Sequence, residues 1–384
     1  MLEIQRSVAP GSTTRVGIVS TFPPTRCGIA RFTASLCEVI ARDETGLELD
    51  VVRLINEPTP NPGSKGLVQM EIDPSSALSI RAAAHHLDRC DVVIINHEFG
   101  IFGPKDGASV VDLVRLIDVP TMTVLHTVLP EPGERQRRIL EDLAEITTPV
   151  VLCESARRLL VERYSVPESS VEMIRHGAHW DAQPVNPPPW RHLITWGLLG
   201  PGKGLERSIA AMAELRDLDP PVRYRIVGRT HPNVVRNAGY VYRHSLQRLA
   251  RDLGVDDIVE FVDRYVDEDE LFDLVADSDV VVVPYDNRDQ VSSGVMTEAI
   301  GLGRPVVATR FPFAEELLAS GAGLVVDHDV SAMASAIRHL LEDPVAYRRA
   351  AREAANMSTQ LSWEAVGERY WELLQRLAPA QATA

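Results

Sequence analysis

Short, uninterrupted apolar runs recur along this chain, and segments with helical spacing separate them. Residues 91–96 (DVVIIN) and 279–283 (DVVVV) are the clearest examples. A strand that is apolar on both sides must be covered on both faces, as in a parallel sheet flanked by helices. Strands that alternate with helices in this way indicate βαβ units. The sequence therefore predicts an α/β fold with parallel sheets.

The alternating pattern occurs twice, and a proline-rich segment separates the two copies. Residues 183–190 (QPVNPPPW) contain four prolines, which cannot sit inside a helix or a central strand. The length of 384 residues also exceeds what one hydrophobic core usually serves. We therefore expect one Rossmann-like domain over residues 1–185, a second over 186–361, and a final helix within 362–384 that crosses back to the first domain. Ligands of such sheets bind at the carboxyl ends of the strands, so the two sheets should face an interdomain cleft.

The charge balance limits the classes of partner. The formal net charge is −15, whereas a nucleic-acid-binding protein needs a basic face, so we expect no nucleic-acid partner. No run of about 18 apolar residues occurs, so we expect no transmembrane segment. Arginines gather only within predicted helices, where a solvated face is the main interpretation and weak peripheral contact with an anionic membrane is the alternative. The sequence does not indicate an oligomeric state.

The cysteines and the amino terminus favour a cytoplasmic location. The four cysteines include no Cys-x-x-Cys pair, which fits reduced thiols better than a disulfide framework. Residues 1–14 lack an apolar core of signal-peptide length.

The first predicted domain has a glycine-containing loop between its first strand and first helix. Residues 22–31 read FPPTRCGIAR, and Gly28 would let backbone approach a ligand at the helix start, where an anion is favoured. The loop lacks the Gly-x-Gly-x-x-Gly spacing of dinucleotide sites. A tight turn explains the loop equally well as a binding role, in which Arg26 would contact an acceptor.

Polar side chains follow two other strands of this domain. His97, Glu98 and Phe99 follow the run 91–96, and His126 ends the run 121–126. Carboxylate and aromatic groups suit sugars, which offer hydroxyl donors and C–H faces. Because both histidines end neighbouring strands, we expect them to face one cleft. For His97 alone, a histidine satisfied at a strand end is the simpler interpretation.

The second predicted domain contains two candidate phosphate sites. Residues 197–204 (GLLGPGKG) connect a strand to a helix, so their backbone amides and Lys203 could hold a diphosphate, although the spacing excludes a Walker A loop. Ser293 and Gly294 would form the first turn of another helix with free N–H groups. Glu298 lies about one turn further, where a carboxylate could accept both hydroxyls of a ribose. A capped core helix is the alternative.

With these features in order along the whole chain, the sequence resembles the retaining glycosyltransferases of family 4, which have the GT-B fold of two Rossmann-like domains. The strongest signature of that family is Glu, seven residues, Glu, then Ala-x-x-x-Gly-x-Pro, and residues 290–305 are similar to it. The other matching elements are Pro24–Gly28, His176-Gly177 and Gly197 to Lys203-Gly204.

The resemblance implies transfer of a hexose from a GDP- or UDP-linked sugar to a hydroxyl acceptor, with retention, and with neither a metal nor another cofactor. The first domain would bind the sugar or small-molecule acceptor. Near the reacting carbon the resemblance implies a histidine, with His126 as the first candidate and His97 as the second. The implied donor contacts are Lys203 and Gly204 for the diphosphate, Ser293, Gly294 and Val295 for the phosphate, Glu298 for the ribose, the segment 263–266 with Tyr265 for the base, and residue 290 for the sugar.

Two departures from that family's pattern affect the predicted chemistry. Residue 290 is Gln where the family usually has Glu, and an amide cannot stabilise a cationic sugar by charge. Leu198 stands where an arginine is usual, and Arg229 is the candidate to replace it. Arg229 begins an inserted block, residues 229–243, which we expect to contribute to the cleft. An exposed helical insertion is the competing explanation.

Three alternatives to a transferase remain open from the sequence. A disaccharide phosphorylase of the same fold is the first, because Gln290 is neutral and residue 198 is not arginine. A nucleotide-sugar epimerase of similar fold fits the ordered elements less well. A sugar-nucleotide-binding protein with impaired catalysis is the third.

Overall fold

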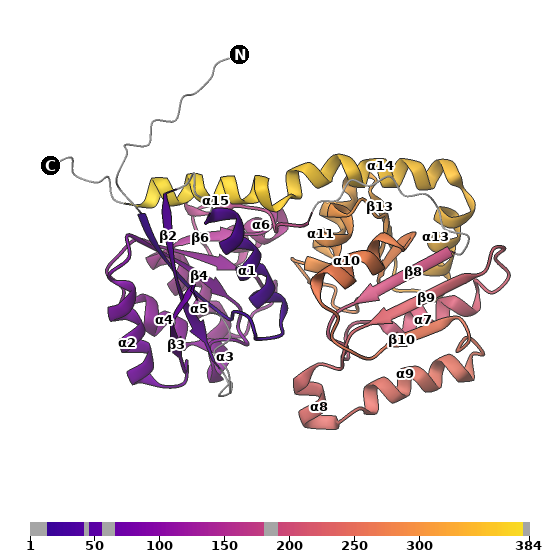
Figure 1. Ribbon diagram of the computed structural model, residues 1–384, viewed down its shortest axis with the longest axis horizontal. Helices are drawn as coiled ribbons and strands as arrows, with labels where there is room; N and C mark the ends of the chain where they lie inside the picture. Colours follow the sequence, from indigo (N-terminus) through magenta and orange to yellow (C-terminus); the bar gives the residue numbers. More distant parts are fainter. Residues whose placement is uncertain (1–13, 42–45, 56–65, 180–190, 379–384) are drawn as a thin grey trace, which may run out of the picture. The chain divides into compact units, whose positions relative to one another are not determined.

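The computed structural model describes residues 14–41, 46–55, 66–179 and 191–378 (Figure 1). The chain forms two compact units. The first holds the described residues up to Ile174 and those from Val366 onward, and the second runs from Arg175 to Ala365. The predicted proline-rich segment 183–190 lies outside the described residues. The two units are treated separately below.

The first unit contains a parallel sheet with the strand order β3-β2-β1-β4-β5-β6-β7 among the described residues. Helices cover both faces of this sheet (Figure 1). Its strands are β1 (Thr14–Ser20), β2 (Leu47–Leu54), β3 (Val68–Ile72), β4 (Val92–His97), β5 (Thr121–Leu125), β6 (Thr148–Val151) and β7 (Glu172–Met173). Its helices are α1 (Gly28–Ile40), α2 (Ala77–Leu87), α3 (Pro104–Gly107), α4 (Ser109–Val114), α5 (Glu134–Ile146) and α6 (Glu154–Arg163).

The central strands of this sheet are apolar on both faces, as the sequence predicts. In β4 every residue is buried, and β1 is buried from Val16 to its end. The strand order reverses direction between β1 and β4, and such a switch point opens a crevice at the carboxyl ends of the two strands. Those ends carry Ser20 and His97.

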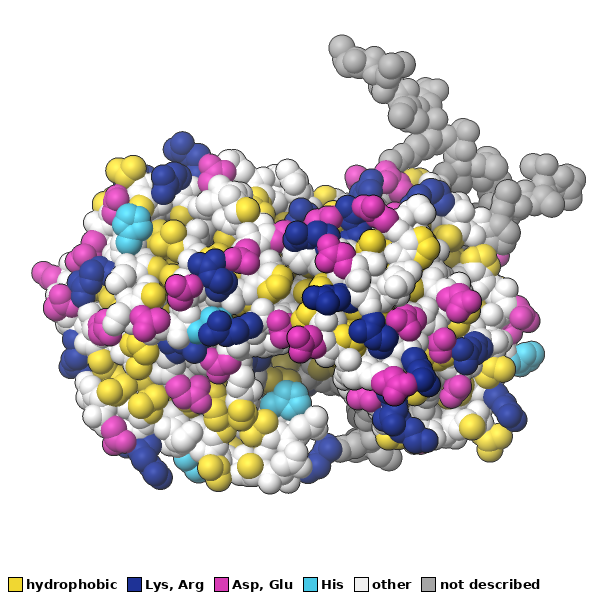
Figure 2. Space-filling model, turned by 180° about the vertical axis from the view of Figure 1, so that it is seen from behind, with side chains coloured by type: hydrophobic (Ala, Val, Ile, Leu, Met, Phe, Trp, Pro, Cys, Tyr) yellow, Lys and Arg dark blue, Asp and Glu magenta, His cyan; other side chains and the backbone are white. Residues whose placement is uncertain are grey.

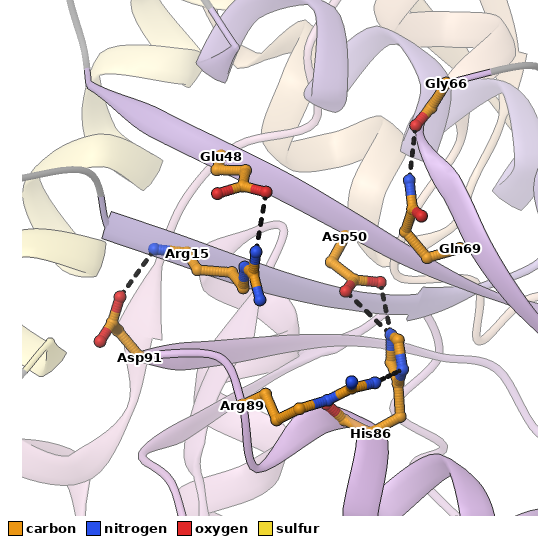
Figure 3. Close-up of polar contacts among 8 residues, drawn as sticks. All are labelled: Arg15, Glu48, Asp50, Gly66, Gln69, His86, Arg89 and Asp91. Carbon is orange, nitrogen blue, oxygen red and sulfur yellow. Dashed lines mark hydrogen bonds and ion pairs between the residues drawn. The ribbon is translucent and has the colours of Figure 1, made fainter.

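Polar side chains on the other half of this sheet pair with one another (Figure 3). The Arg15 backbone N–H donates to Asp91 Oδ2 at 2.7 Å, and the Arg15 guanidinium contacts Glu48 Oε1 at 2.9 Å. His86 Nε2 lies 2.8 Å from Asp50 Oδ2. Because each donor meets a carboxylate, these groups are satisfied locally and have a structural role near the amino ends of the strands, away from the carboxyl ends.

The second unit contains a second parallel sheet, with the order β10-β9-β8-β11-β12-β13 among the described residues. The switch point lies between β8 and β11. Its strands are β8 (Arg191–Trp196), β9 (Val222–Val227), β10 (Val259–Val262), β11 (Val280–Val283), β12 (Val306–Thr309) and β13 (Gly323–Val326). Its helices are α7 (Leu205–Ala213), α8 (Pro232–Ala238), α9 (Val241–Asp252), α10 (Glu268–Ala276), α11 (Gly294–Gly301), α12 (Pro312–Leu317), α13 (Val330–Glu342) and α14 (Pro344–Leu361).

The core of the second unit follows from the same patterns. Leu205, Leu246 and Ile337 from α7, α9 and α13 are buried in one cluster with Leu193 and Val282 of the sheet. The helix α9 begins at Val241, near the end of the inserted block 229–243. The inserted block 229–243 contains α8, in which none of the described residues is buried, and this fits the competing expectation of an exposed helical insertion. His231 is its N-cap, and Pro232 is its first residue.

The final helix, α15 (Trp363–Leu377), has the bounds that the sequence predicts. Its residues from Val366 onward belong to the first unit. There Arg376 forms an ion pair with Glu172 at 2.8 Å, and Gly367 packs so closely that an added Cβ would lie 2.8 Å from a methyl carbon of Val39. A side chain at residue 367 would therefore disturb the packing of α15 on α1.

The apolar character of the described helices and the distribution of surface charge both concern the predicted partners. None of the helices among the described residues has both the length and the apolar character needed to cross a membrane. On the face shown in Figure 2, Lys and Arg side chains alternate with Asp and Glu and do not gather in one basic field.

Candidate active site

His126 follows directly after β5 and lies in a buried hydrogen-bonded chain of the first unit. Its ring is 5% exposed, and Nε2 lies 3.1 Å from Asn96 Oδ1. The Asn96 amide donates to Thr33 Oγ1 at 3.2 Å, and Thr33 Oγ1 lies 2.7 Å from Ser20 Oγ. The edge of Phe32 packs on the imidazole at 4.7 Å between centroids. Because Asn96 offers its oxygen, Nε2 carries a proton, and the ring orientation is fixed.

His97 occupies a different environment, although it ends the neighbouring strand. It is fully buried, and none of the described residues gives either ring nitrogen a hydrogen-bond partner. The rings of Phe99 and Phe102 lie 5.0 and 6.1 Å from it. Burial lowers the pKa of His97 to about 3, so the ring is neutral near pH 7. The fully buried ring presents no exposed atom, and the role of His97 near the reacting carbon stays a prediction.

Glu98 joins the ends of β4 and β5. Its Oε1 accepts the Phe99 backbone N–H at 2.9 Å, and its Oε2 accepts the Thr127 hydroxyl at 2.6 Å. Burial raises the pKa of the Glu98 carboxyl. Both oxygens already have partners, so Glu98 holds the two strand ends together, whereas the half-buried Phe99 ring remains available as an apolar contact.

The loop before α1 carries two of the predicted ligand residues, Arg26 and Gly28, at its surface. Arg26 and Gly28 are exposed, and a Cβ added to Gly28 would meet no atom within 4 Å. Cys27 caps the helix, since its sulfur accepts the Ala30 N–H at 3.4 Å. Local packing therefore does not require glycine at residue 28.

In the second unit, the predicted diphosphate loop packs against the residues that follow β11. Gly204 has a φ of +62°, and a Cβ on it would lie 1.8 Å from the Pro284 carbonyl oxygen. Both facts require glycine at this position. The Lys203 ammonium lies 4.1 Å from the centroid of the Tyr285 ring, a cation–π distance. The loop is thus held at the carboxyl ends of β8 and β11 with one cation beside it.

At the amino terminus of α11 the structure has the serine cap that the sequence offers as the alternative to a phosphate site, and the phosphate role stays a prediction. Ser293 is the N-cap, and its hydroxyl oxygen accepts the Met296 N–H at 3.3 Å. Gly294 and Val295 are half-buried, and a Cβ on Gly294 would lie 3.3 Å from His176 Nε2. The first turn therefore exposes backbone beside His176, the histidine of the His-Gly pair.

Glu298 is positioned by the segment that follows that pair. Its Oε2 accepts the His179 backbone N–H at 3.1 Å, and its Oε1 lies 3.4 Å from His179 Nδ1. His179 is a site residue that sequence reasoning missed, because its partner lies 119 residues away. The His179 imidazole also packs against the Phe272 ring, with 4.5 Å between the ring centroids.

Gln290 and the remaining predicted donor contacts lie around these loops. The Gln290 amide donates to the Ser292 carbonyl at 2.7 Å, so it braces the turn before α11. Tyr265 is 41% exposed, and Arg229 is exposed. The Leu199 N–H donates to the Arg229 carbonyl at 2.9 Å, which joins the inserted block to the diphosphate loop.

Arg243 is a second residue that the sequence did not mark. It is 2% exposed, forms an ion pair with Asp263 at 3.0 Å and donates to the Gly228 carbonyl. It therefore links the loops that follow β9 and β10, and the second of these contains Tyr265. Among the described residues no group of three or more His, Cys, Asp and Glu side chains is arranged to hold a metal ion.

Comparison with known proteins identifies the second unit. Residues 191–343 match the family model for group 1 glycosyl transferases. The chain is 32% identical over 188 residues to the D-inositol 3-phosphate glycosyltransferase of Corynebacterium efficiens, covering 48% of this chain and 42% of that protein. It is 37% identical over 186 residues to a GDP-mannose-dependent alpha-(1-6)-phosphatidylinositol monomannoside mannosyltransferase of Mycolicibacterium smegmatis, covering 46% and 45%. Both matches span less than half of the relative's length.

Solved structures extend the likeness to nearly the whole chain. A glycosyltransferase from Rickettsia africae aligns with a TM-score of 0.74 at 13% identity, covering 96% of this chain and all of that one. The Anabaena protein HepE, solved in complex with UDP-glucose, aligns with a TM-score of 0.71 at 17% identity, covering 94% and 100%. These likenesses confirm the predicted GT-B fold of two Rossmann-like domains, and within it residues 191–343 are similar to the group 1 glycosyl transferases.

Proposed function

We propose that this chain is a retaining, metal-independent glycosyltransferase of family 4 that moves a hexose from a GDP- or UDP-linked sugar to a hydroxyl acceptor. The observation that carries the proposal is the arrangement in the second unit. Lys203 projects from a loop that only glycine at residue 204 permits, and Glu298 lies about one turn inside the neighbouring helix α11. A cation beside free amides suits a diphosphate, and a carboxylate suits a ribose.

In the proposed reaction the bond between the anomeric carbon and the diphosphate oxygen breaks. A bond to the acceptor oxygen forms on the same face of the sugar, and the acceptor's hydroxyl proton passes to the departing diphosphate oxygen. Negative charge develops on the departing diphosphate, where the Lys203 ammonium stabilises it together with loop amides that have no backbone partner among the described residues, such as that of the exposed Gly202. Glu298 keeps lone pairs beyond those used by His179, so each of its oxygens can still accept a ribose hydroxyl.

For the first unit, we propose that His126 acts near the reacting carbon and that Arg26 and Phe99 contact the acceptor. The fixed imidazole of His126 supports this role, because catalytic groups need a held orientation. The names of the relatives include inositol 3-phosphate and phosphatidylinositol monomannoside as acceptors. Polyol phosphates and mannosylated inositol lipids therefore belong in the acceptor panel.

A disaccharide phosphorylase is the second candidate, and Gln290 favours it. Its side chain is a neutral amide bound to the Ser292 carbonyl, so it supplies no charge to a cationic sugar. In that reaction inorganic phosphate would occupy the place of the donor diphosphate.

The test is release of nucleoside diphosphate from a panel of GDP-, UDP- and ADP-linked hexoses, with and without acceptors, in EDTA. We expect acceptor-dependent release from at least one donor and a product with the donor's anomeric configuration by NMR. Lys203→Met should weaken donor binding about 10- to 100-fold, since it removes a charged hydrogen-bond donor. Lys105→Met, at an exposed position in the first unit, is the matched control. Cleavage of a disaccharide with phosphate, without binding of any nucleotide sugar, would establish the phosphorylase instead.

A second measurement concerns His126. His126→Ala should lower turnover far more than it changes the dissociation constant of the donor. Unchanged turnover would remove His126 from the reaction.

A further inference from the structure

His231 lies on the loop after β9, and this loop is paired with the diphosphate loop. Its backbone N–H donates to the Leu199 carbonyl at 2.8 Å, while the Leu199 N–H donates to the Arg229 carbonyl at 2.9 Å. These two bonds form a short parallel bridge between residues 199 and 230. The position of His231 relative to the diphosphate loop is therefore set by backbone contacts.

The His231 side chain lies over the middle of that loop. A Cβ built on Gly200 would lie 3.9 Å from His231 Cβ, which is ordinary van der Waals contact. Burial, and then the positive charge of Lys203, lowers the pKa of His231. The imidazole and the Lys203 ammonium thus lie close enough to interact electrostatically.

The hydrogen bonds of the ring determine its tautomer. Nδ1 accepts the Asn233 backbone N–H at 3.1 Å, as the N-cap of α8. A nitrogen that accepts an N–H bond carries no proton, so a neutral imidazole in this position holds its proton on Nε2. The side chain is half-buried, and the hydrogen bond described for its ring uses Nδ1 alone. His231 therefore carries an N–H donor on the loop that pairs with the Lys203 loop.

We propose that His231 is a second substrate-contacting residue of the donor site, whose Nε2–H donates to a phosphate oxygen of the nucleotide diphosphate that Lys203 binds. This inference rests on the proposed function, because it needs a diphosphate on the 197–204 loop. The contact supplies a directional donor where the family's arginine is replaced by Leu198. Because the ring is neutral, this contact adds no second full positive charge to that of Lys203.

The competing explanation is that His231 only caps α8, and two substitutions separate the two roles. His231→Asn keeps a short side-chain acceptor, which is a strong N-cap, but loses the distal N–H. His231→Gln places an amide N–H near the position of Nε2 but is a poor cap. His244→Asn, at an exposed position on α9, is the control for removing an imidazole.

The measurements are dissociation constants for GDP and UDP by titration calorimetry and the urea midpoint of each variant. We expect His231→Asn to keep the midpoint and to weaken the preferred nucleotide about 10-fold or more, as the loss of a hydrogen bond to a charged group predicts. His231→Gln should lower the midpoint and bind more tightly than His231→Asn. If His231→Asn binds the nucleotide more tightly than His231→Gln, His231 does not contact the nucleotide and only caps α8.

Two further results separate this inference from the proposed function. If the unmodified protein binds neither nucleotide, both the proposed function and the His231 contact are wrong. If Lys203→Met weakens binding while His231→Asn binds as tightly as the unmodified protein, only the His231 contact is wrong. Imidazole ¹⁵N spectra should show the Nε2–H tautomer, with a shift on addition of the nucleotide, and the Nδ1–H tautomer would contradict the inference.

Discussion

The buried imidazole of His97 should make the stability of the first unit sensitive to acid. The ring is fully buried between Phe99 and Phe102, and neither nitrogen has a hydrogen-bond partner among the described residues. Protonation in the folded state would therefore place an unpaired charge in the core. That cost is the physical reason that burial lowers the pKa of His97 to about 3.

The sign and size of the effect follow from linkage between protonation and folding. In the unfolded chain a histidine has a pKa of about 6.5. Between pH 6.5 and 3 the unfolded state therefore binds a proton that the folded state does not, so the free energy of unfolding falls as the pH falls. Each pH unit in this window costs about 1.4 kcal/mol. At pH 4.5 the loss from His97 alone should be about 2.7 kcal/mol relative to pH 8.

Urea unfolding of the intact protein and of His97→Leu between pH 8 and 4.5 measures this loss. Leucine keeps apolar contact with the two phenylalanines and cannot be protonated. We expect the variant to gain about 2.7 kcal/mol relative to the intact protein over that range. His85→Leu, at an exposed position on α2, should leave the pH dependence unchanged. If the curves of the intact protein and His97→Leu stay parallel down to pH 4.5, the ring is not an unpartnered neutral group.

Five further substitutions at four positions test by urea unfolding the contacts that hold the loops of the second unit. Gly204→Ala combines a φ of +62° with a contact of 1.8 Å to a backbone carbonyl and should cost about 2–5 kcal/mol. Gly202→Ala, with a φ of +89° in open space, should cost only about 1–2 kcal/mol, and equal losses would contradict the clash. Ser293→Ala removes the cap of α11 and should cost about 1 kcal/mol, which Ser293→Asp should restore. Arg243→Met breaks the ion pair with the half-exposed Asp263 and should cost about 2–3 kcal/mol, whereas an unchanged midpoint would show that the pair contributes nothing.

Much of the fold could be predicted because its strands are apolar on both faces. Runs such as DVVIIN and DVVVV have no other stable placement than a sheet covered by helices on both sides. The bounds of α15 were also readable, since its apolar residues keep helical spacing from Trp363 to Leu377. The short edge strands β3 and β7 were missed, because few residues and mixed burial give them no clear pattern.

The candidate site was predictable where backbone conformation decides the residue type. Gly204 and Ser293 belong to this class, since a positive φ and a helix cap each select a residue locally. His179 and Arg243 could not be found in this way. Their partners, Glu298 and Asp263, lie in other elements, and only the folded chain brings them together. The burial of His97 was hidden for the same reason.

The donor side of the second unit is held mainly by backbone contacts between loops. The loop after β8 contacts the Pro284 carbonyl through Gly204 and pairs with the loop after β9 through Leu199. The residues that depart from the family's pattern make none of these contacts through their side chains. A change at Leu198 can therefore alter the proposed diphosphate site while the loops keep their positions, whereas a change at Gln290 would also remove its hydrogen bond to the Ser292 carbonyl. The backbone groups that set the geometry of these loops thus differ from the side chains that set the charge of the site. The donor or the direction of the reaction can therefore change without a change of fold.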